Sequence, residues 1–460
     1  MSPSRYRQWM GLVAALAFLA PASGARGAPI EDGAATHELT LSDCLSQTLL
    51  QSPEIQRLRQ DLERAAGDRV VYRSRALPQL AGSIDAGLRT GPLYSPAGPY
   101  AALQAAFTQP LIDVGVPPSW HRGTMEVIIA EQSLGKEINS RLHEARVTFL
   151  SALYFRDLIG LYRQIGARLQ ANADGARQRL DAGTGGQAAL MEAQIQVLNL
   201  GRDLTALSNS YFTAITHLAE LTGRDPAPGA DGGAQLDLPR PVGTLSYVAT
   251  QPDWRQATAE ALRDRADLKL LQALVDATAS EKRITQAGYF PLVSLTASEL
   301  FLPSDILLSK RSTTVVTDQG TISSEHRAGV QMSWAIIDNG QVTGAARSLE
   351  AVRQEYQIDL CKLEQAVPRE LARIRGDLEH QDAQLAALQK SAEEAEENLK
   401  LIESKVALGQ ATQLDFLDAQ RGLLSVRAGI VSAVYLHEVA RAEIDLATGR
   451  YLEFTAAGAP

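Results

Sequence analysis

An internal duplication constrains the fold of this chain more than any other feature of its sequence. Three segments of the first half recur in the second half in the same order: 53–55 at 266–268, 77–80 at 290–293, and 111–115 at 336–340. The last pair is the clearest, because Leu-Ile-Asp-Val-Gly is matched by Ile-Ile-Asp-Asn-Gly. The offset in residue number between corresponding positions is larger for this last pair than for the first two. We therefore expect a longer loop in the second copy, around residues 301–327. The sequence therefore predicts two copies of one structural unit.

The duplication divides the chain into two structural repeats, 29–224 and 253–450, followed by a C-terminal tail, 451–460. The connector between the repeats, 225–252, is rich in proline and glycine, which excludes a regular helix. Residues 1–28 begin with arginines, continue with a short apolar run and end in small residues, which is the pattern of a secretory signal peptide. We therefore expect the mature chain to be exported.

Each repeat contains two stretches in which apolar side chains alternate with polar or small ones, as in β-strands. The predicted strands are about 79–89 and 101–112 in the first repeat, and about 292–301 and 328–337 in the second. In the second repeat the alternation predicts a lipid face and a lumen face: Val293, Leu295, Val330, Met332 and Trp334 against Ser294, Thr296, Gln331 and Ser333. Each stretch has the length of a tilted strand that crosses an outer membrane. Alternation alone favours a half-buried hairpin in a soluble domain, whereas export, repetition and the flanking helices favour membrane strands.

Two long helices are predicted after each hairpin, about 116–181 with 188–222 and about 341–407 with 412–448. At about 1.5 Å per residue, the longer helices would extend roughly 100 Å. The last pair has apolar residues at heptad spacing and a second apolar stripe on the returning helix, which predicts packing on two sides. His437 occupies a heptad position, where we expect a packed or capped histidine rather than a ligand.

Composition excludes several classes of function. A net charge of −9 provides no basic excess for binding nucleic acid. Cys44 and Cys361 are too few for a disulfide scaffold or a Cys-rich metal site, and we expect both to be buried or half-buried thiols. The sequence contains no recognisable catalytic or metal-binding arrangement, so neither an enzyme nor a cofactor is expected.

The segment 183–186 has the glycines of a phosphate loop but not the lysine that should follow, so we expect a turn between two helices.

These features, taken in order, resemble the TolC-like outer-membrane efflux protein family. The resemblance rests on the signal peptide, Thr40-Leu41-Ser42 before a helix that ends at Leu77-Pro78, the run from Gln109 to Gly115 and the two helical hairpins. It covers about residues 39–450 and implies a mainly α-helical homotrimer in the outer membrane of a Gram-negative bacterium. Each chain would supply four strands to one transmembrane β-barrel of twelve strands, and its helices to a long periplasmic α-barrel. The implied fold is a trimeric α/β-barrel channel-tunnel.

The resemblance also implies a function and partners. The protein would be an outer-membrane export channel, a passive conduit of a tripartite efflux or type I secretion system. A periplasmic adaptor (membrane fusion) protein would couple it to an inner-membrane transporter, and outer-membrane lipid would surround the barrel. The sequence does not indicate the cargo. The alternative is a soluble periplasmic coiled-coil scaffold or adaptor protein, in which the four strands form a small sheet.

Two aspartates, Asp415 and Asp418, follow the second helical reversal three residues apart, which puts both on one helix face. The sequence alone leaves open that they are solvated acids in a first helical turn, favoured by the helix dipole. In the resembled family this position carries paired aspartates that line the closed periplasmic mouth. The resemblance therefore implies a ring of acids that favours cations over anions. In the first repeat only Glu192 corresponds to them.

The two helical reversals, at Gly183-Thr184 and Gly409-Gln410, match the positions at which the resembled family contacts its periplasmic adaptor. Both glycines also fit the left-handed position that commonly ends a helix. A structural role in the turn and a role in docking are compatible, and we expect both.

Overall fold

The structure is a computed structural model, and the residues that it describes begin at Glu38. These residues are 38–89, 98–224, 227–228, 234–235, 238–301, 316–317, 320–321 and 324–451. The predicted signal peptide, 1–28, lies outside the described residues. So does most of the loop expected around 301–327, and all of the C-terminal tail except its first residue.

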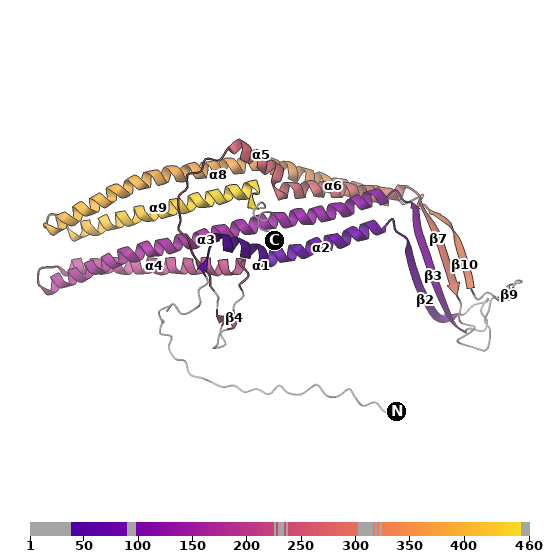
Figure 1. The fold of residues 1–460 in the computed structure, drawn as a ribbon, viewed down its shortest axis with the longest axis horizontal. Coiled ribbons are helices and arrows are strands. Elements are labelled where there is room, and N and C mark those ends of the chain that lie inside the picture. The colour runs from indigo at the N-terminus through magenta and orange to yellow at the C-terminus, as the bar shows by residue number, and fades with distance from the viewer. Residues whose placement is uncertain are drawn as a thin grey trace, which may run out of the picture. The chain divides into compact units, whose positions relative to one another are not determined.

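The elements of the second repeat follow those of the first in the same order (Figure 1). The first repeat contains β1 (Glu38–Leu39), α1 (Leu41–Gln51), α2 (Pro53–Ser74), β2 (Gln79–Arg89), β3 (Gly98–Ile112), α3 (Val116–Asp181) and α4 (Gln187–Leu221). The second contains α5 (Trp254–Asp264), α6 (Ala266–Gln286), η1 (Ala287–Tyr289), β7 (Leu292–Phe301), β10 (Ser324–Ser333), α8 (Gln341–Ala407) and α9 (Gln413–Thr448). Short strands lie in the connector and before β10: β4 (Ala227–Pro228), β5 (Ala234–Gln235), β6 (Arg240–Pro241), β8 (Val316–Thr317) and β9 (Gly320–Thr321).

Two pairs of long helices form most of the described structure. The helix α3 has 66 residues and α8 has 67, so each extends about 100 Å. Within the pairs α3 packs against α4 and α8 against α9, while α3 also contacts α9 and so joins the two repeats. Heptad positions of the second pair are buried at Leu385, Leu399 and Leu423, and His437 is fully buried, as expected. By length and composition α9 could cross a membrane, but in the described structure it packs against α8 and α3.

A four-stranded antiparallel sheet lies at the end of the helices opposite the two reversals (Figure 1). Its order is β10-β7-β3-β2, so the strands of the two repeats pair with each other between β3 and β7. The register places Val330 opposite Leu295 and Met332 opposite Val293, which puts all four on one face. Leu80 and Phe107 face each other in the same way between β2 and β3. Within the described chain, β2 and β10 each have a neighbour on one side only.

The last predicted strand, 328–337, is shifted in the structure to Ser324–Ser333. Its ladder ends at Ser333 because its partner β7 begins at Leu292, and no residue of β7 remains to pair with Trp334. The indole of Trp334 instead donates a hydrogen bond to the carbonyl of Tyr289, 3.1 Å away. Trp334 therefore lies beyond the strand to which we assigned it. The second predicted strand, 101–112, starts earlier than expected, at Gly98.

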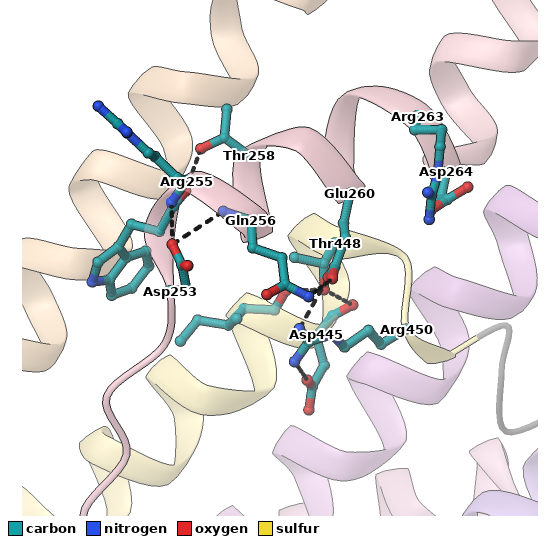
Figure 2. A network of polar contacts seen from close by, with 12 residues as sticks. Asp253, Arg255, Gln256, Thr258, Glu260, Arg263, Asp264, Asp445, Thr448 and Arg450 are labelled. Carbon is teal, nitrogen blue, oxygen red and sulfur yellow. Dashed lines mark hydrogen bonds and ion pairs between the residues drawn. The ribbon is translucent and has the colours of Figure 1, made fainter.

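The connector links the two repeats through contacts on both sides. Strand β6 pairs in parallel with β1, and the Arg156 side chain of α3 donates to the carbonyls of Pro241 and Gly243. At the other end Asp253 caps α5 by accepting from two backbone N–H groups, as Figure 2 shows. In the same network Arg450 donates to Glu260 of α5 at 3.0 Å. The end of α9 is thereby joined to α5 at the start of the second repeat.

The two cysteines have different environments. Cys44 is fully buried among apolar side chains of α1 and α3, and burial raises the pKa of its thiol to about 12. Cys361 is exposed on α8, so our expectation of a buried or half-buried thiol is wrong for this residue. The heptad stripe does not pass through Cys361, which leaves its side chain on the solvent face of the helix.

Candidate functional site

The two helical reversals have the same backbone geometry. Gly183 has φ +69° and Gly409 has φ +71°, which confirms the expected left-handed conformation. In the first reversal the N–H of Thr184 donates to Arg179 O at 2.9 Å, and in the second the N–H of Gln410 donates to Lys405 O at 2.8 Å. Each glycine N–H donates three residues back, which completes a Schellman cap at both sites. The expected turn at 183–186 thus begins as a helix end in which the N–H groups of Gly183 and Thr184 are both hydrogen-bonded.

Gly183 and Gly409 are required because of their positive φ angles, and not because neighbouring atoms leave no room for a side chain. A Cβ atom built on Gly183 or Gly409 would meet no other atom within 4 Å. Thr184 and Gln410 are exposed beside them, and Leu408 is 71% exposed at the second tip. Both tips therefore present accessible side chains on a backbone fixed by hydrogen bonds.

Asp415 completes a capping box at the start of α9. Its carboxylate accepts from the backbone N–H and the hydroxyl of Thr412, both at 2.7 Å, and its own N–H donates to the Thr412 hydroxyl at 3.2 Å. These hydrogen bonds from Thr412 hold the pKa of the Asp415 carboxyl below its usual range. The first-turn role that the sequence left open therefore describes Asp415. The Thr412-x-x-Asp415 spacing is itself a capping-box signature that sequence reasoning missed.

Asp418 lies one turn further along α9 with an exposed side chain. One of its oxygens is 3.4 Å from the guanidinium of Arg421, which also donates to Gln196 of α4 at 3.1 Å. Asp418 is thus connected through Arg421 to the neighbouring repeat, a link that the sequence did not reveal. Its first-repeat counterpart Glu192 is half-buried in α4, and Gly186, the N-cap residue of that helix, provides no side-chain cap.

Side chains of α3 and α4 hold the start of α9 in place. The Gln413 amide donates to Asn172 of α3, and Arg179 reaches the Gln413 oxygen at 3.5 Å. Behind these contacts Leu417 is buried against α3 and α4, beside a cavity of about 420 Å³. Contacts between the repeats therefore position the start of α9, the helix that carries both aspartates.

A sequence profile of the outer membrane efflux protein family matches residues 44–224 and 257–450, most of both repeats. The chain belongs to this family. Outer membrane efflux protein BepC of Brucella suis is 22% identical to this efflux protein over 325 residues, which are 71% of this chain and 66% of BepC. Alkaline protease secretion protein AprF of Pseudomonas aeruginosa is 20% identical over 344 residues, 74% of this chain and 68% of AprF. The match thus spans about two thirds of the length of each relative.

A solved structure agrees with this assignment. The outer membrane protein VceC of Vibrio cholerae superimposes on this efflux protein with a TM-score of 0.73 at 16% identity, over 89% of this chain and 96% of VceC. The shared fold is the channel-tunnel fold of the family, with mostly helical structure. As a member of the family, the efflux protein is an outer-membrane protein whose long helices extend into the periplasm.

Proposed function

We propose that three copies of this chain form an export channel through the outer membrane. The observation that carries the proposal is the sheet, which has an apolar face and an open strand at each edge. Leu80, Ile84 and Leu88 of β2 are each more than 75% exposed on that face. Apolar exposure of this extent suits lipid, and unpaired strand edges cannot lie in lipid. Pairing β2 of one copy with β10 of the next would close a barrel of twelve strands.

The channel would be a passive conduit of a tripartite efflux or type I secretion system. The exposed tips at Gly183-Thr184 and Gly409-Gln410 would contact a periplasmic adaptor protein, which would connect the channel to an inner-membrane transporter. Asp418, with Asp415 beside it, would contribute to an acidic aperture at the periplasmic mouth. BepC is named for efflux and AprF for secretion of alkaline protease, which supports both kinds of export as candidates here.

Membrane fractionation followed by electrical recording tests this proposal. The mature protein should be recovered with the outer membrane, require detergent for extraction and run as a trimer on native gels. Inserted into planar bilayers, it should conduct ions in discrete steps. Recovery in the soluble periplasm without detergent would instead support the coiled-coil scaffold or adaptor alternative and contradict the channel.

A further inference from the structure

The connector segment from Leu238 to Asp253 crosses both pairs of long helices on its way to α5 (Figure 1). It is fastened to the first pair by Arg156 of α3, which donates to Pro241 O at 3.2 Å and to Gly243 O at 2.7 Å. It is fastened to the second pair by His437 of α9, which contacts Val248. Any movement of one helical pair relative to the other therefore has to strain or release one of these two attachments.

The second attachment is a buried histidine between two oxygen atoms. His437 has no solvent-exposed surface, its Nε2 lies 3.1 Å from the carbonyl oxygen of Val248, and its Nδ1 lies 2.8 Å from a carboxylate oxygen of Asp382 on α8. The Tyr247 ring packs against the imidazole with centroids 4.7 Å apart. Nδ1 and the facing Asp382 oxygen are both buried, and neither has another partner within the described residues.

These contacts fix the number of protons on the imidazole. A carbonyl oxygen can only accept, so Nε2 must carry a hydrogen. A neutral ring would then leave a lone pair on Nδ1 facing a carboxylate oxygen at 2.8 Å, and two buried acceptors would have no donor. A second proton between Nδ1 and Asp382 satisfies both atoms. The contact does not have ideal hydrogen-bond direction, so its strength rests on opposite charge.

We propose that the His437–Asp382 pair is a proton-dependent latch that holds the connector on the second helical pair. Loss of one proton to solvent as the pH rises leaves the imidazole a single N–H for two acceptors. The Asp382 carboxylate, the stronger acceptor, takes it at Nδ1, so the Val248 carbonyl loses its donor. Tyr247-Val248 is then released from α9, while Arg156 keeps the first attachment on α3. The latch adds one link between the two helical pairs when it is protonated and removes that link when it is not, while the direct contacts between α3 and α9 remain. This device goes beyond the export role and does not depend on it.

The charged groups around His437 leave Asp382 as the side chain that controls this proton. On α9, the next residue Glu438 is paired with Arg441 at 2.7 Å. On α8, one turn from Asp382, Glu379 is paired with Arg375 at 2.7 Å. On the connector, burial, the nearby Asp382 carboxylate and a hydrogen bond to it raise the pKa of the Tyr247 phenol, which therefore stays neutral up to pH about 9.

Spin-label mobility on the full-length protein in detergent tests the latch. A nitroxide attached at Val248→Cys, in a Cys361→Ser background, reports the second attachment without altering the Val248 carbonyl. Its mobile spectral fraction should rise at least about twofold between pH about 5 and pH about 9. A label at Thr244→Cys, beside the Arg156 attachment, should keep its mobility. An unchanged Val248→Cys spectrum, or an equal rise at both positions, would overturn the proposal.

Asp382→Asn is the matched variant. The amide of asparagine can donate to Nδ1 of a neutral imidazole and can accept from a protonated one, so the attachment should persist at both pH values. The mobile fraction at Val248→Cys should then stay low throughout. His437→Gln removes the titrating group, so its spectrum should no longer depend on pH. A pH-dependent rise that survives in either variant would show that another group is responsible and would refute the latch.

Discussion

At the scale of single residues, the two aspartates near the reversal have different roles. Asp415 is engaged by Thr412 in a capping box, whereas Asp418 contacts only the exposed Arg421 among its described partners. The spacing of three residues predicted that both share a helix face, but it did not distinguish their partners. Hydrogen bonds to a helix N-terminus need the backbone geometry of the turn, which the spacing of acids alone does not reveal.

Neutralising both aspartates separates charge from capping. In Asp415→Asn/Asp418→Asn the amide can still accept from the Thr412 N–H, so the helix start should remain formed while the charges disappear. We expect reduced cation preference and weaker block by multivalent cations, measured as reversal potentials across a salt gradient in planar bilayers. Asp415→Ala/Asp418→Asn should show the same electrical change and, in addition, lower stability to urea, because the cap is lost. A reversal potential equal to that of the wild type would discard the acidic aperture and leave the channel fold intact.

The tip glycines allow a second test at this scale. Valine at Gly183 and Gly409 would force a β-branched residue into positive φ, at a cost of about 1–2 kcal/mol each. We expect the double valine variant to lose export and adaptor cross-linking while its trimers persist on native gels. Asparagine tolerates positive φ, so Gly183→Asn/Gly409→Asn is the control that should keep the turn and the docking. Normal export by the valine variant would remove the tips from the docking surface.

At the scale of elements, periodicity predicted where helices and strands lie, because helical and strand spacings are local properties of the sequence. The helix predicted at 116–181 occupies Val116–Asp181 in the structure. The end of β10 could not be predicted in the same way, because it depends on where the partner strand β7 begins. The side-chain links that position the reversal, such as Arg421 with Gln196, join residues 225 apart in the sequence and have no local signal.

The repeated Asp-x-Gly turns after β3 and β10 offer a matched pair for stability. Burial raises the pKa of the Asp113 carboxyl, but its hydrogen bonds from Arg75 and from the Gly115 N–H outweigh burial and lower the pKa overall. Asp113→Asn should therefore lower the free energy of unfolding by about 1–3 kcal/mol. Because Arg75 is partly exposed, solvent screens its ion pair with Asp113, and we expect a loss toward the lower end of this range. In the second repeat Asp338 accepts only from the backbone N–H groups of Gly340 and Val342 among its described contacts, so Asp338→Asn should cost less.

The pH dependence of these two variants follows from the sign of the shift. Because the folded pKa of Asp113 lies below its unfolded value, its contribution is complete above the unfolded value and is lost as the pH falls through the folded one. Urea unfolding of the detergent-solubilised protein at neutral pH and at pH about 3 should show the wild type approaching Asp113→Asn at the lower pH. Equal losses for Asp113→Asn and Asp338→Asn at neutral pH would mean that the Arg75 pair contributes nothing.

At the scale of the whole molecule, the sheet determines how copies of the chain can associate. Leu295 lies on the apolar face opposite Val330, whereas Thr296 lies on the other face opposite Gly329 and Thr108. Arginine in place of Leu295 would put a charge into lipid and should weaken assembly by about 2–4 kcal/mol if it lies near the bilayer midplane. Arginine in place of Thr296 would face the water-filled lumen and should be tolerated.

The difference between the two arginine variants is measured as the amount of heat-resistant trimer on native gels and the amount of protein recovered with the outer membrane. Because β7 is paired on both sides within the chain, neither substitution touches a strand edge, so any loss reports the environment of the face and not strand pairing. A small soluble sheet, as in the scaffold alternative, would also have a buried face and an exposed face. In a soluble scaffold, however, Leu295→Arg should unfold or dissociate the protein in the absence of any membrane. Equal behaviour of the two arginine variants would contradict the assigned faces, and with them the barrel built on this sheet.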